Sequence, residues 1–444
     1  MNFAKRAEET ESAIIKDRHF LHEHAELSFE EKETTAYLVS ELEKMGIPVQ
    51  TFSDYTGCIA TIKGKKGDGP TILLRADIDA LPIMEESGVD FASRTPGVMH
   101  ACGHDCHASM LLGAARLLKE QEKELKGTVK LLFQAAEEAF IGSHYYVDHG
   151  YLEGIDAAMG MHVWPTGPAG QVLIKDGELM ASCDNFKITV HGVSTHGSMP
   201  HLGKDAIVAA SSILLGLQHI VSRVNDPLNS LVVSVGKVSA GTQFNIITDT
   251  AVMEGTVRCY AKETRAMVEE TMRRIVTDIA AAEECTAELE YSYLEPSVVN
   301  GDPELTEIAR EAAEKLYGPD AWAEAKKAGG SEDFSYVMDH IPSSMFAFLG
   351  GYDEKDEDIY PLHNGKFRVN EKILKKGAAF YAQFAADYLE KKGFQIERGI
   401  AGLPTAFRAV YEQGKGGPSF GFLAEYDALK GIGHACGHHM QGPS

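Results

Sequence analysis

The segment TILLRADIDALP, residues 71–82, places an apolar run of strand length directly before two aspartates, Asp77 and Asp79. Two further runs, CIATIKG at 58–64 and TVKLLFQAA at 128–136, have the same length and character. A stretch with helical periodicity lies between the first and the last of these three runs. Strands that alternate with helices predict an α/β domain whose helices flank a mostly parallel sheet. Such sheets bind their ligands at the carboxyl ends of the strands, where the two aspartates lie.

A different pattern begins near Cys183. A strand, a helix, two strands, a helix and a strand follow at 184–193, 205–221, 230–239, 249–261, 263–283 and 286–294. That order predicts a ferredoxin-like α+β domain. A chain of 444 residues is also too long for one ordinary core. We therefore expect a catalytic domain formed by residues 1–183 and 300–392, an inserted domain at 184–299 and an appended segment at 393–444.

The composition excludes several kinds of partner. The net charge of −23 and the lack of a basic cluster argue against nucleic-acid binding and against anionic membranes. No uninterrupted apolar stretch approaches the ~20 residues of a membrane helix, and no signal sequence is visible at the amino end. Seven scattered cysteines are typical of reduced thiols, so we expect a cytoplasmic protein.

Potential metal ligands follow several of the predicted strands. In HACGHD at 100–105, Cys102 and His104 point to the same side of an extended segment and could share a metal ion. His162 ends the apolar run DAAMGMHV, and His363 precedes the last predicted helix in PLHNGKF. An isolated histidine or Cys-x-His pair is more often structural. Their convergence at strand ends nevertheless favours a metal site.

Two adjacent carboxylates, Glu137 and Glu138, follow the strand at 128–136. Next to a cation, one of them could bind a metal while the other takes a proton from metal-bound water. A solvated helix start would also accept two acids. Asp77 could hold a ligand histidine or bridge two metals. Together these groups predict a metal-assisted hydrolase.

The ordered motifs RADIDALP, HACGHD, AAEEAF, GMH, HGVSTHGSMPHLGKDAI, GTVR, GGSEDF and PLHN resemble the metal-dependent amidohydrolase/carboxypeptidase family. That family includes hippurate hydrolases, bacterial N-acyl-amino-acid amidohydrolases and plant auxin-conjugate hydrolases. The resemblance runs from about residue 10 to residue 390. It implies hydrolysis of the amide bond of an N-acyl amino acid, on a di-metal peptidase-like domain that carries an inserted dimerisation domain.

The resemblance also implies roles for individual residues. Glu137 matches the general base, and Asp77 an acid that supports the site from behind. His196, Asn245 and Arg258 match groups of the inserted domain that contact the substrate, with His196 reaching the site of the neighbouring subunit in a homodimer. Five residues match the ligands of two divalent ions, either zinc or manganese: Cys102, His104, Glu138, His162 and His363.

Other functions stay open at this point. A cysteine hydrolase would use Cys102 as its nucleophile with a histidine base, and would survive chelators but not alkylating reagents. A metal-binding dimer without activity is a second alternative. Within the hydrolases, a dipeptidase or an aminobenzoyl-glutamate hydrolase is the nearest alternative to an N-acyl amino acid amidohydrolase.

The appended segment contains a second HACGH, at 434–438. Residues 393–444 resemble the start of an aminobenzoyl-glutamate hydrolase-type relative. Cys436 and His438 are followed by no acid pair and no further ligand motif, and two ligands fall short of the three or four that zinc usually has. We therefore expect an incomplete second copy with at most a weak metal site.

Overall fold

The computed structural model describes residues 2–352, 359–392, 395–398 and 407–410. The chain divides into two units, Met1–Gly393 and Phe394–Ser444. In the second unit, β17 (Gln395–Arg398) pairs antiparallel with β18 (Phe407–Val410). The second HACGH, and with it the expectation for Cys436 and His438, lies outside the described residues.

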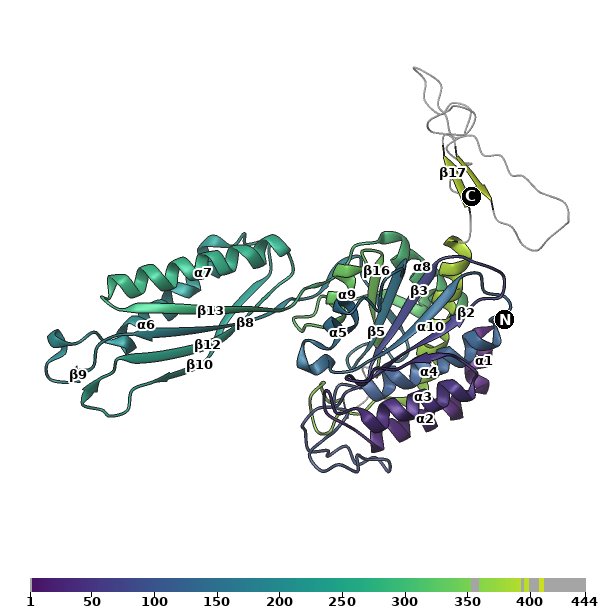
Figure 1. Ribbon diagram of the computed structural model, residues 1–444, viewed down its shortest axis with the longest axis horizontal. Coiled ribbons are helices and arrows are strands. Elements are labelled where there is room, and N and C mark those ends of the chain that lie inside the picture. The colour runs from purple at the N-terminus through teal and green to yellow at the C-terminus, as the bar shows by residue number, and fades with distance from the viewer. Residues whose placement is uncertain (1, 353–358, 393–394, 399–406, 411–444) are drawn as a thin grey trace, which may run out of the picture. The chain divides into compact units, whose positions relative to one another are not determined.

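An eight-stranded mixed sheet forms the centre of the first unit (Figure 1). Its four inner strands run parallel in the order β4, β3, β5, β16, so the predicted α/β fold with a mostly parallel sheet is confirmed. Strands β1 and β2 extend one side antiparallel, and β6 and β15 extend the other. The eight strands in spatial order are β1 Val49–Gln50, β2 Cys58–Lys63, β4 Thr128–Gln134, β3 Thr71–Asp77, β5 Ala157–Trp164, β16 Ser344–Gly350, β6 Val172–Ile174 and β15 Trp322–Glu324.

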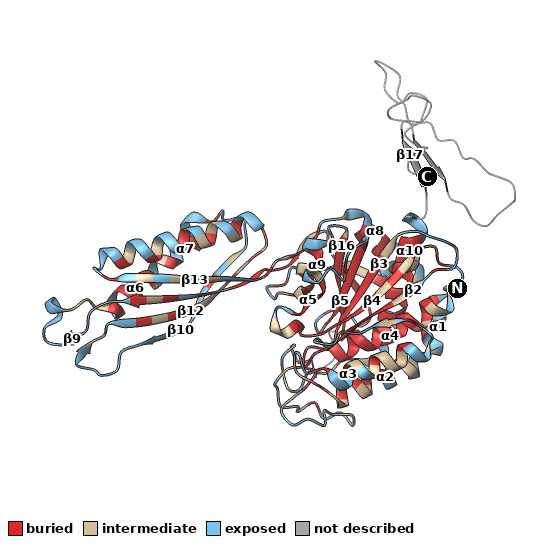
Figure 2. Ribbon diagram, in the orientation of Figure 1, coloured by how far each residue is buried: buried red, intermediate tan, exposed pale blue. Residues whose placement is uncertain are grey.

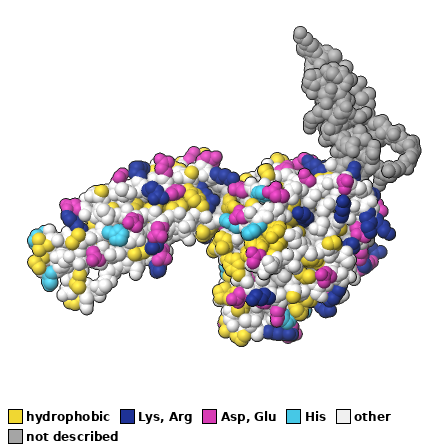
Figure 3. Space-filling model, viewed as in Figure 1, with side chains coloured by type: hydrophobic (Ala, Val, Ile, Leu, Met, Phe, Trp, Pro, Cys, Tyr) yellow, Lys and Arg dark blue, Asp and Glu magenta, His cyan; other side chains and the backbone are white. Residues whose placement is uncertain are grey.

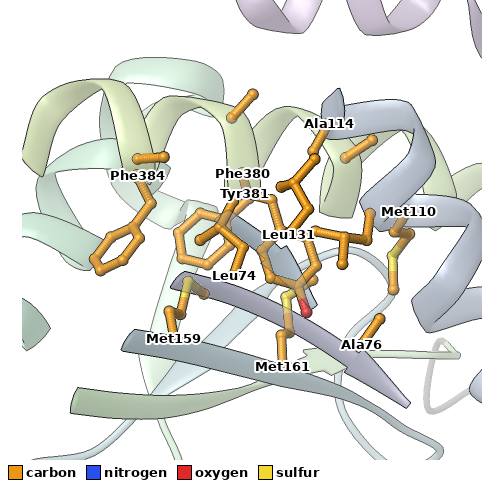
Figure 4. Close-up of a cluster of buried hydrophobic side chains, with 14 of the residues drawn as sticks. Leu74, Ala76, Met110, Ala114, Leu131, Met159, Met161, Phe380, Tyr381 and Phe384 are labelled. Carbon is orange, nitrogen blue, oxygen red and sulfur yellow. The ribbon is translucent and has the colours of Figure 1, made fainter. Parts of the chain in front are cut away.

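Helices cover both faces of this sheet. Neighbouring residues of a strand point to opposite sides, so each strand contributes side chains to the packing on both faces. Leu74 and Leu131 face α4 (His104–Glu120) and α10 (Leu374–Lys392), where they join a core with Met159 and Phe380 (Figure 4). Leu73, by contrast, packs in the core that includes residues of α5 (Gly142–Asp148) and α9 (Phe334–His340). The strands are therefore buried on both sides (Figure 2).

The remaining elements of this part of the chain support the same core. The amino end forms three separate helices, and the short 3-10 turn η1 contains the predicted site residues Glu137 and Glu138. The bounds are α1 Phe3–Glu9, α2 Glu11–Glu23, α3 Lys32–Lys44, η1 Glu137–Ala139, β7 Gly177–Met180, β14 Val298–Asn300, α8 Pro303–Tyr317, η4 Pro319–Ala321 and η5 Glu371–Ile373.

A four-stranded antiparallel sheet lies between β7 and β14 in the chain, in the order β10-β12-β8-β13. With two helices between its strands, this is the ferredoxin-like arrangement. The boundaries at 183 and 300 stay predictions. The elements are β8 Cys183–His191, β9 Thr195–His196, η2 Pro200–Leu202, α6 Ala206–His219, η3 Ile220–Val224, β10 Leu231–Ala240, β11 Ile246–Ile247, β12 Thr250–Cys259, α7 Lys262–Ala282 and β13 Thr286–Glu295.

One helical stretch, Ala206–Val224, is long and apolar enough by length and composition to cross a membrane, and 28% of its most apolar part is buried. It is not an uninterrupted apolar run, so the expectation that no such run approaches that length is not contradicted. Single polar residues such as Gln218 interrupt the apolar run without lowering its average below that of a membrane helix. Its buried residues, including Ile213 and Leu217, pack on the inserted sheet. That the protein binds no membrane stays a prediction.

Leu74→Ala should lower the free energy of unfolding by about 3 kcal/mol, because Leu74 is fully buried and the substitution leaves a cavity between β3 and α10. Leu228→Ala is the matched control, since Leu228 is 91% exposed and should change stability by less than about 0.5 kcal/mol. Urea denaturation followed by circular dichroism measures both values. Equal losses for the two variants would contradict the assigned core.

Candidate metal centre

The structure brings the five predicted ligands together beside the carboxyl ends of β3 and β4. Cys102 Sγ lies 3.3 Å from His162 Nε2, and His363 Nε2 lies 3.4 Å from Glu138 Oε1. His104 Nε2 lies 3.9 Å from the same Glu138 oxygen. Sets of three ligand atoms within 4.8 Å of one another include Cys102–His104–His162, Cys102–Glu138–His363 and His104–Glu137–Glu138. Each of the five therefore belongs to at least one set that could hold a metal ion.

Local backbone geometry aims these side chains. Gly103, between two of the ligands, has φ 91°, and a Cβ there would lie 2.5 Å from Val163 Cγ2. Glycine is therefore the residue that fits where the chain turns into α4. His363 also adopts a positive φ of 62°, and its N–H donates to the Ala101 carbonyl at 2.9 Å. That bond fastens the loop of His363 to the segment of Cys102.

His104 is oriented by a carboxylate behind it. Its Nδ1 lies 3.1 Å from Asp79 Oδ1, and its Nε2 is buried without a hydrogen-bond partner. Glu138 Oε1 is a second buried atom without a partner. A histidine held by a carboxylate, with its other nitrogen free, is the usual arrangement around a protein-bound metal. The two unpartnered atoms and the thiol, imidazole and carboxylate donors therefore fit a divalent cation.

Asp77 is fully buried, and its partners differ from those of Asp79. It accepts from His107 Nδ1 at 2.6 Å and from Arg75 at 2.7 Å, and it lies 3.8 Å from His104 Nε2. His107 Nε2 in turn accepts from the Val163 N–H. Because both nitrogens of His107 are engaged, His107 is structural.

A second group of acids lies behind Glu137. Arg75, fully buried in β3, contacts Asp77, Glu332 and Asp333 at 2.7, 2.8 and 2.8 Å. Glu137 belongs with Glu332 and Asp333 to another set of acid oxygens within 4.8 Å. Burial, Glu332 and Glu138 together raise the pKa of Glu137 well above its usual value.

The same excess of negative charge acts on the ligands. Burial and then the carboxylates of Glu138 and Glu137 raise the pKa of the Cys102 thiol well above its usual value. Burial lowers the pKa of His104, but Asp77 and Asp79 outweigh it and raise that pKa to about 10. A metal needs a thiolate and a neutral imidazole as ligands. A bound cation favours the thiolate and the neutral imidazole, which opposes both shifts, so the electrostatics also fit a metal.

The three predicted substrate groups lie in two places. Asn245 and His196 meet where β11 pairs with β9, and the Gly197 N–H donates to the Asn245 carbonyl at 2.8 Å. Arg258 lies eight residues beyond Thr250 along β12, which corresponds to about 27 Å of strand. There it donates to Ser331 Oγ at 3.1 Å, next to Glu332. Within one chain, therefore, Arg258 lies next to the acid group while His196 and Asn245 lie at the opposite end of the inserted sheet.

Residues 73–387, more than half of the chain, match the model of peptidase family M20/M25/M40. The chain belongs to this family. Relatives at high identity cover nearly the same length. N-acetyl-L-cysteine deacetylase of Bacillus subtilis is 41% identical over 380 residues, which are 86% of this chain and 89% of that protein. IAA-amino acid hydrolase ILR1-like 4 of Arabidopsis thaliana is 38% identical over 84% of each chain.

Two solved structures agree with the fold. The YXEP protein of Bacillus subtilis, described as a dinuclear metal-binding peptidase of the M20 family, superposes with a TM-score of 0.76 and 39% identity over 86% of this chain and 99% of that chain. An aminobenzoyl-glutamate utilization protein of Klebsiella pneumoniae, at 20% identity and a TM-score of 0.64, shares the fold.

Sequence reasoning missed the groups behind the ligands. Asp79 was expected only to lie near the site, and Glu332 and Asp333 entered only as part of the motif GGSEDF. Arg75 carried one usable signal, since an arginine inside an otherwise apolar strand needs a buried partner. Nothing in the sequence indicated that its partners include Glu332 and Asp333, more than 250 positions away.

Asp79→Asn should weaken metal binding 10- to 100-fold, because the amide orients His104 less strongly than the carboxylate does. Titration of the apoprotein with zinc against a competing chromophoric chelator measures the affinity. The control is Asp156→Asn, which changes an exposed aspartate at the opposite end of β3 whose Oδ2 accepts from the Thr71 N–H. Unchanged affinity in Asp79→Asn would contradict the assigned support of His104.

Proposed function

We propose that this M20 protein hydrolyses the amide bond of N-acyl amino acids, with acetyl, benzoyl or similar acyl groups, and releases a carboxylic acid and a free amino acid. The observation that carries the proposal is the convergence of the five predicted ligands beside Glu137. The deacetylase and IAA-amino acid hydrolase names of relatives at 41% and 38% identity support the substrate class. A dipeptidase remains the alternative within the family.

Cys102, His104, Glu138, His162 and His363 would hold two divalent ions, zinc or manganese. The thiolate favours zinc, whereas carboxylate and imidazole ligands also suit manganese. Such ions lower the pKa of water to roughly 7 and polarise a carbonyl. The B. subtilis structure described as dinuclear supports the number of ions.

Glu137 is the proposed general base. It lies beside the ligand set, 3.9 Å from His104 Nε2, and its side chain is 11% exposed. It takes the proton of the attacking water at a carboxylate oxygen and passes it to the leaving amide nitrogen. The raised pKa that burial and neighbouring acids give Glu137 suits a group that must both accept and return a proton. Arg258, on the inserted domain beside Ser331, would bind the substrate carboxylate.

Glu137→Gln should reduce kcat 10²- to 10⁴-fold while metal content stays at the wild-type level, since the amide keeps the shape but accepts no proton. Hydrolysis of N-acetyl and N-benzoyl amino acids, with metal analysis of the same samples, tests this. Glu153→Gln, at an exposed loop position, should retain full activity. Full turnover in Glu137→Gln would overturn the mechanism.

The cysteine-hydrolase alternative has little support. Cys102 Sγ does lie 3.3 Å from His162 Nε2, as a catalytic pair would. A nucleophilic cysteine, however, needs a lowered pKa, and burial with neighbouring carboxylates raises that of Cys102. Burial and His107 lower the pKa of His162 well below its usual value, which disfavours the imidazolium of a thiolate pair.

The proposal includes a homodimer in the cytoplasm. All six described cysteines are free, as a reducing compartment would leave them. His196 and Asn245 lie at the end of the inserted domain that is remote from Arg258. Hydrophobic side chains gather at that end (Figure 3), and they include the exposed Met199, Leu202 and Phe244. An exposed apolar surface of this kind favours contact with a second subunit, whose site His196 would complete.

A mixture of Glu137→Gln and His196→Ala proteins tests this arrangement. Each variant alone should be nearly inactive. After dissociation and random reassembly, half of the dimers are mixed, and each mixed dimer carries one intact site, so activity should return to about a quarter of the wild-type value. Recovery measured on an N-acyl amino acid, against each variant reassembled alone, gives the result. No recovery would place His196 in the site of its own chain.

A further inference from the structure

Backbone strain in the described residues gathers around the candidate metal centre. Five residues other than glycine have a positive φ, and four of them, Phe29, Ala136, Phe140 and His363, adjoin the site in sequence or space. Phe29 has φ 68° and Phe140 φ 64°. Large side chains rarely adopt this conformation, and such strain is concentrated at functional sites. The two phenylalanines are also 45% and 37% exposed, so burial does not explain them.

One carboxylate oxygen links both phenylalanines to the ligand set. Asp79 Oδ2 accepts from Ser28 Oγ at 2.7 Å and from the Glu138 N–H at 3.0 Å. Ser28 directly precedes Phe29, and Phe140 is two residues beyond Glu138. The other oxygen of Asp79 holds His104. Both aromatic rings are therefore carried by backbone that is anchored within a few ångströms of the metal ligands.

Tyr55 makes a second connection between the segment of Phe29 and the segment that follows Phe140. Its ring meets that of Phe29 edge-on with 5.9 Å between centroids, and its hydroxyl donates to the Gly142 carbonyl at 3.2 Å. Ile141, between Phe140 and Gly142, is 48% exposed. Phe29, Phe140 and Ile141 are therefore exposed apolar residues on the two segments that adjoin Asp79 and Glu138, and we call these three residues the acyl wall.

We propose that the acyl wall binds the acyl group of the substrate and selects aromatic or other large apolar acyl groups over acetyl. This inference rests on the proposed function and extends it to the acyl part of the substrate. Contact with the wall removes the apolar surface of the acyl group from water. The free carboxylate of the substrate would lose its hydration against these apolar side chains, whereas the uncharged acyl end would not, so the acyl end is the part that fits the wall. Arg258 supplies a cation elsewhere, beside Ser331.

Phe140 allows the role in selectivity to be separated from a role in folding. Glycine adopts a φ of 64° without strain, so Phe140→Gly removes the ring and relieves the backbone. Its thermal midpoint should equal or exceed that of the wild type. Phe140→Leu keeps an apolar side chain at the same position and should restore most of the selectivity.

The experiment compares kcat and KM of the metal-loaded, full-length protein for N-benzoylglycine and N-acetylglycine. The wild type should prefer the benzoyl substrate. Phe140→Gly should reduce the ratio of the two kcat/KM values about tenfold, mainly through KM for the benzoyl substrate. Leu228→Ala, an exposed site outside the wall, should leave the ratio at the wild-type value. A ratio unchanged in Phe140→Gly, or a loss that is equal for both substrates, would overturn the proposal.

A second pair of substrates, N-acetylglycine and N-acetylphenylalanine, varies the amino acid with a constant acyl group. Phe140→Gly should leave this ratio within about twofold of the wild type. A tenfold change here would assign the wall to the amino-acid side chain and overturn the proposal, while the proposed function would stand. If the wild type hydrolysed no N-acyl amino acid, the proposed function would fail, and the acyl wall would fail with it.

Discussion

A single buried guanidinium determines how the catalytic part of this protein is arranged. Arg75 lies in the central strand β3 and contacts the carboxylates of Asp77, Glu332 and Asp333, and its Nε donates to Gln134 in β4. Asp333 also accepts from the Gln134 amide and from the Ser143 N–H. The arginine therefore joins two strands, the start of α5 and the loop before α9. Removal of one partner from such a network would leave buried charge without compensation, which typically costs 3–5 kcal/mol.

The network also explains the electrostatics of the candidate centre. Acids outnumber the cation they surround, so burial and the surplus negative charge together raise the pKa of Glu137 and of the Cys102 thiol. Such a site is costly to fold without a cation and favourable to bind one. Binding energy from the metal then contributes to the stability of the folded chain. The arrangement that prepares the chemistry is thus also the one that makes the apoprotein less stable.

Much of this could be predicted from the sequence, for identifiable reasons. The strands 58–64, 71–77 and 128–136 are marked by apolar runs of strand length, and each predicted ligand follows or ends such a run or belongs to an ordered motif. The supporting roles of Asp79, Glu332 and Asp333 were missed because their partners depend on tertiary contacts. Asp77 and Asp79 are two residues apart with similar neighbours, yet Asp79 holds His104 while Asp77 holds His107. Likewise, no local pattern predicts that His196 and Arg258 lie at opposite ends of the inserted domain.

Because of that separation, a small rotation at one end of the inserted sheet displaces the other end by several ångströms. Strand β12 runs without a break from Thr250 to Cys259, and Arg258 near one end is tied to Ser331, beside the acids that surround Arg75. With an arm of about 27 Å, a rotation of about 10° at the Ser331 end displaces the His196 end by about 5 Å. Ångström-scale placement decides whether a polar group reaches a reacting atom. In the proposed dimer, a substitution of Ser331 would therefore change turnover through this angle, although Ser331 is neither a proposed metal ligand nor a proposed substrate-binding residue.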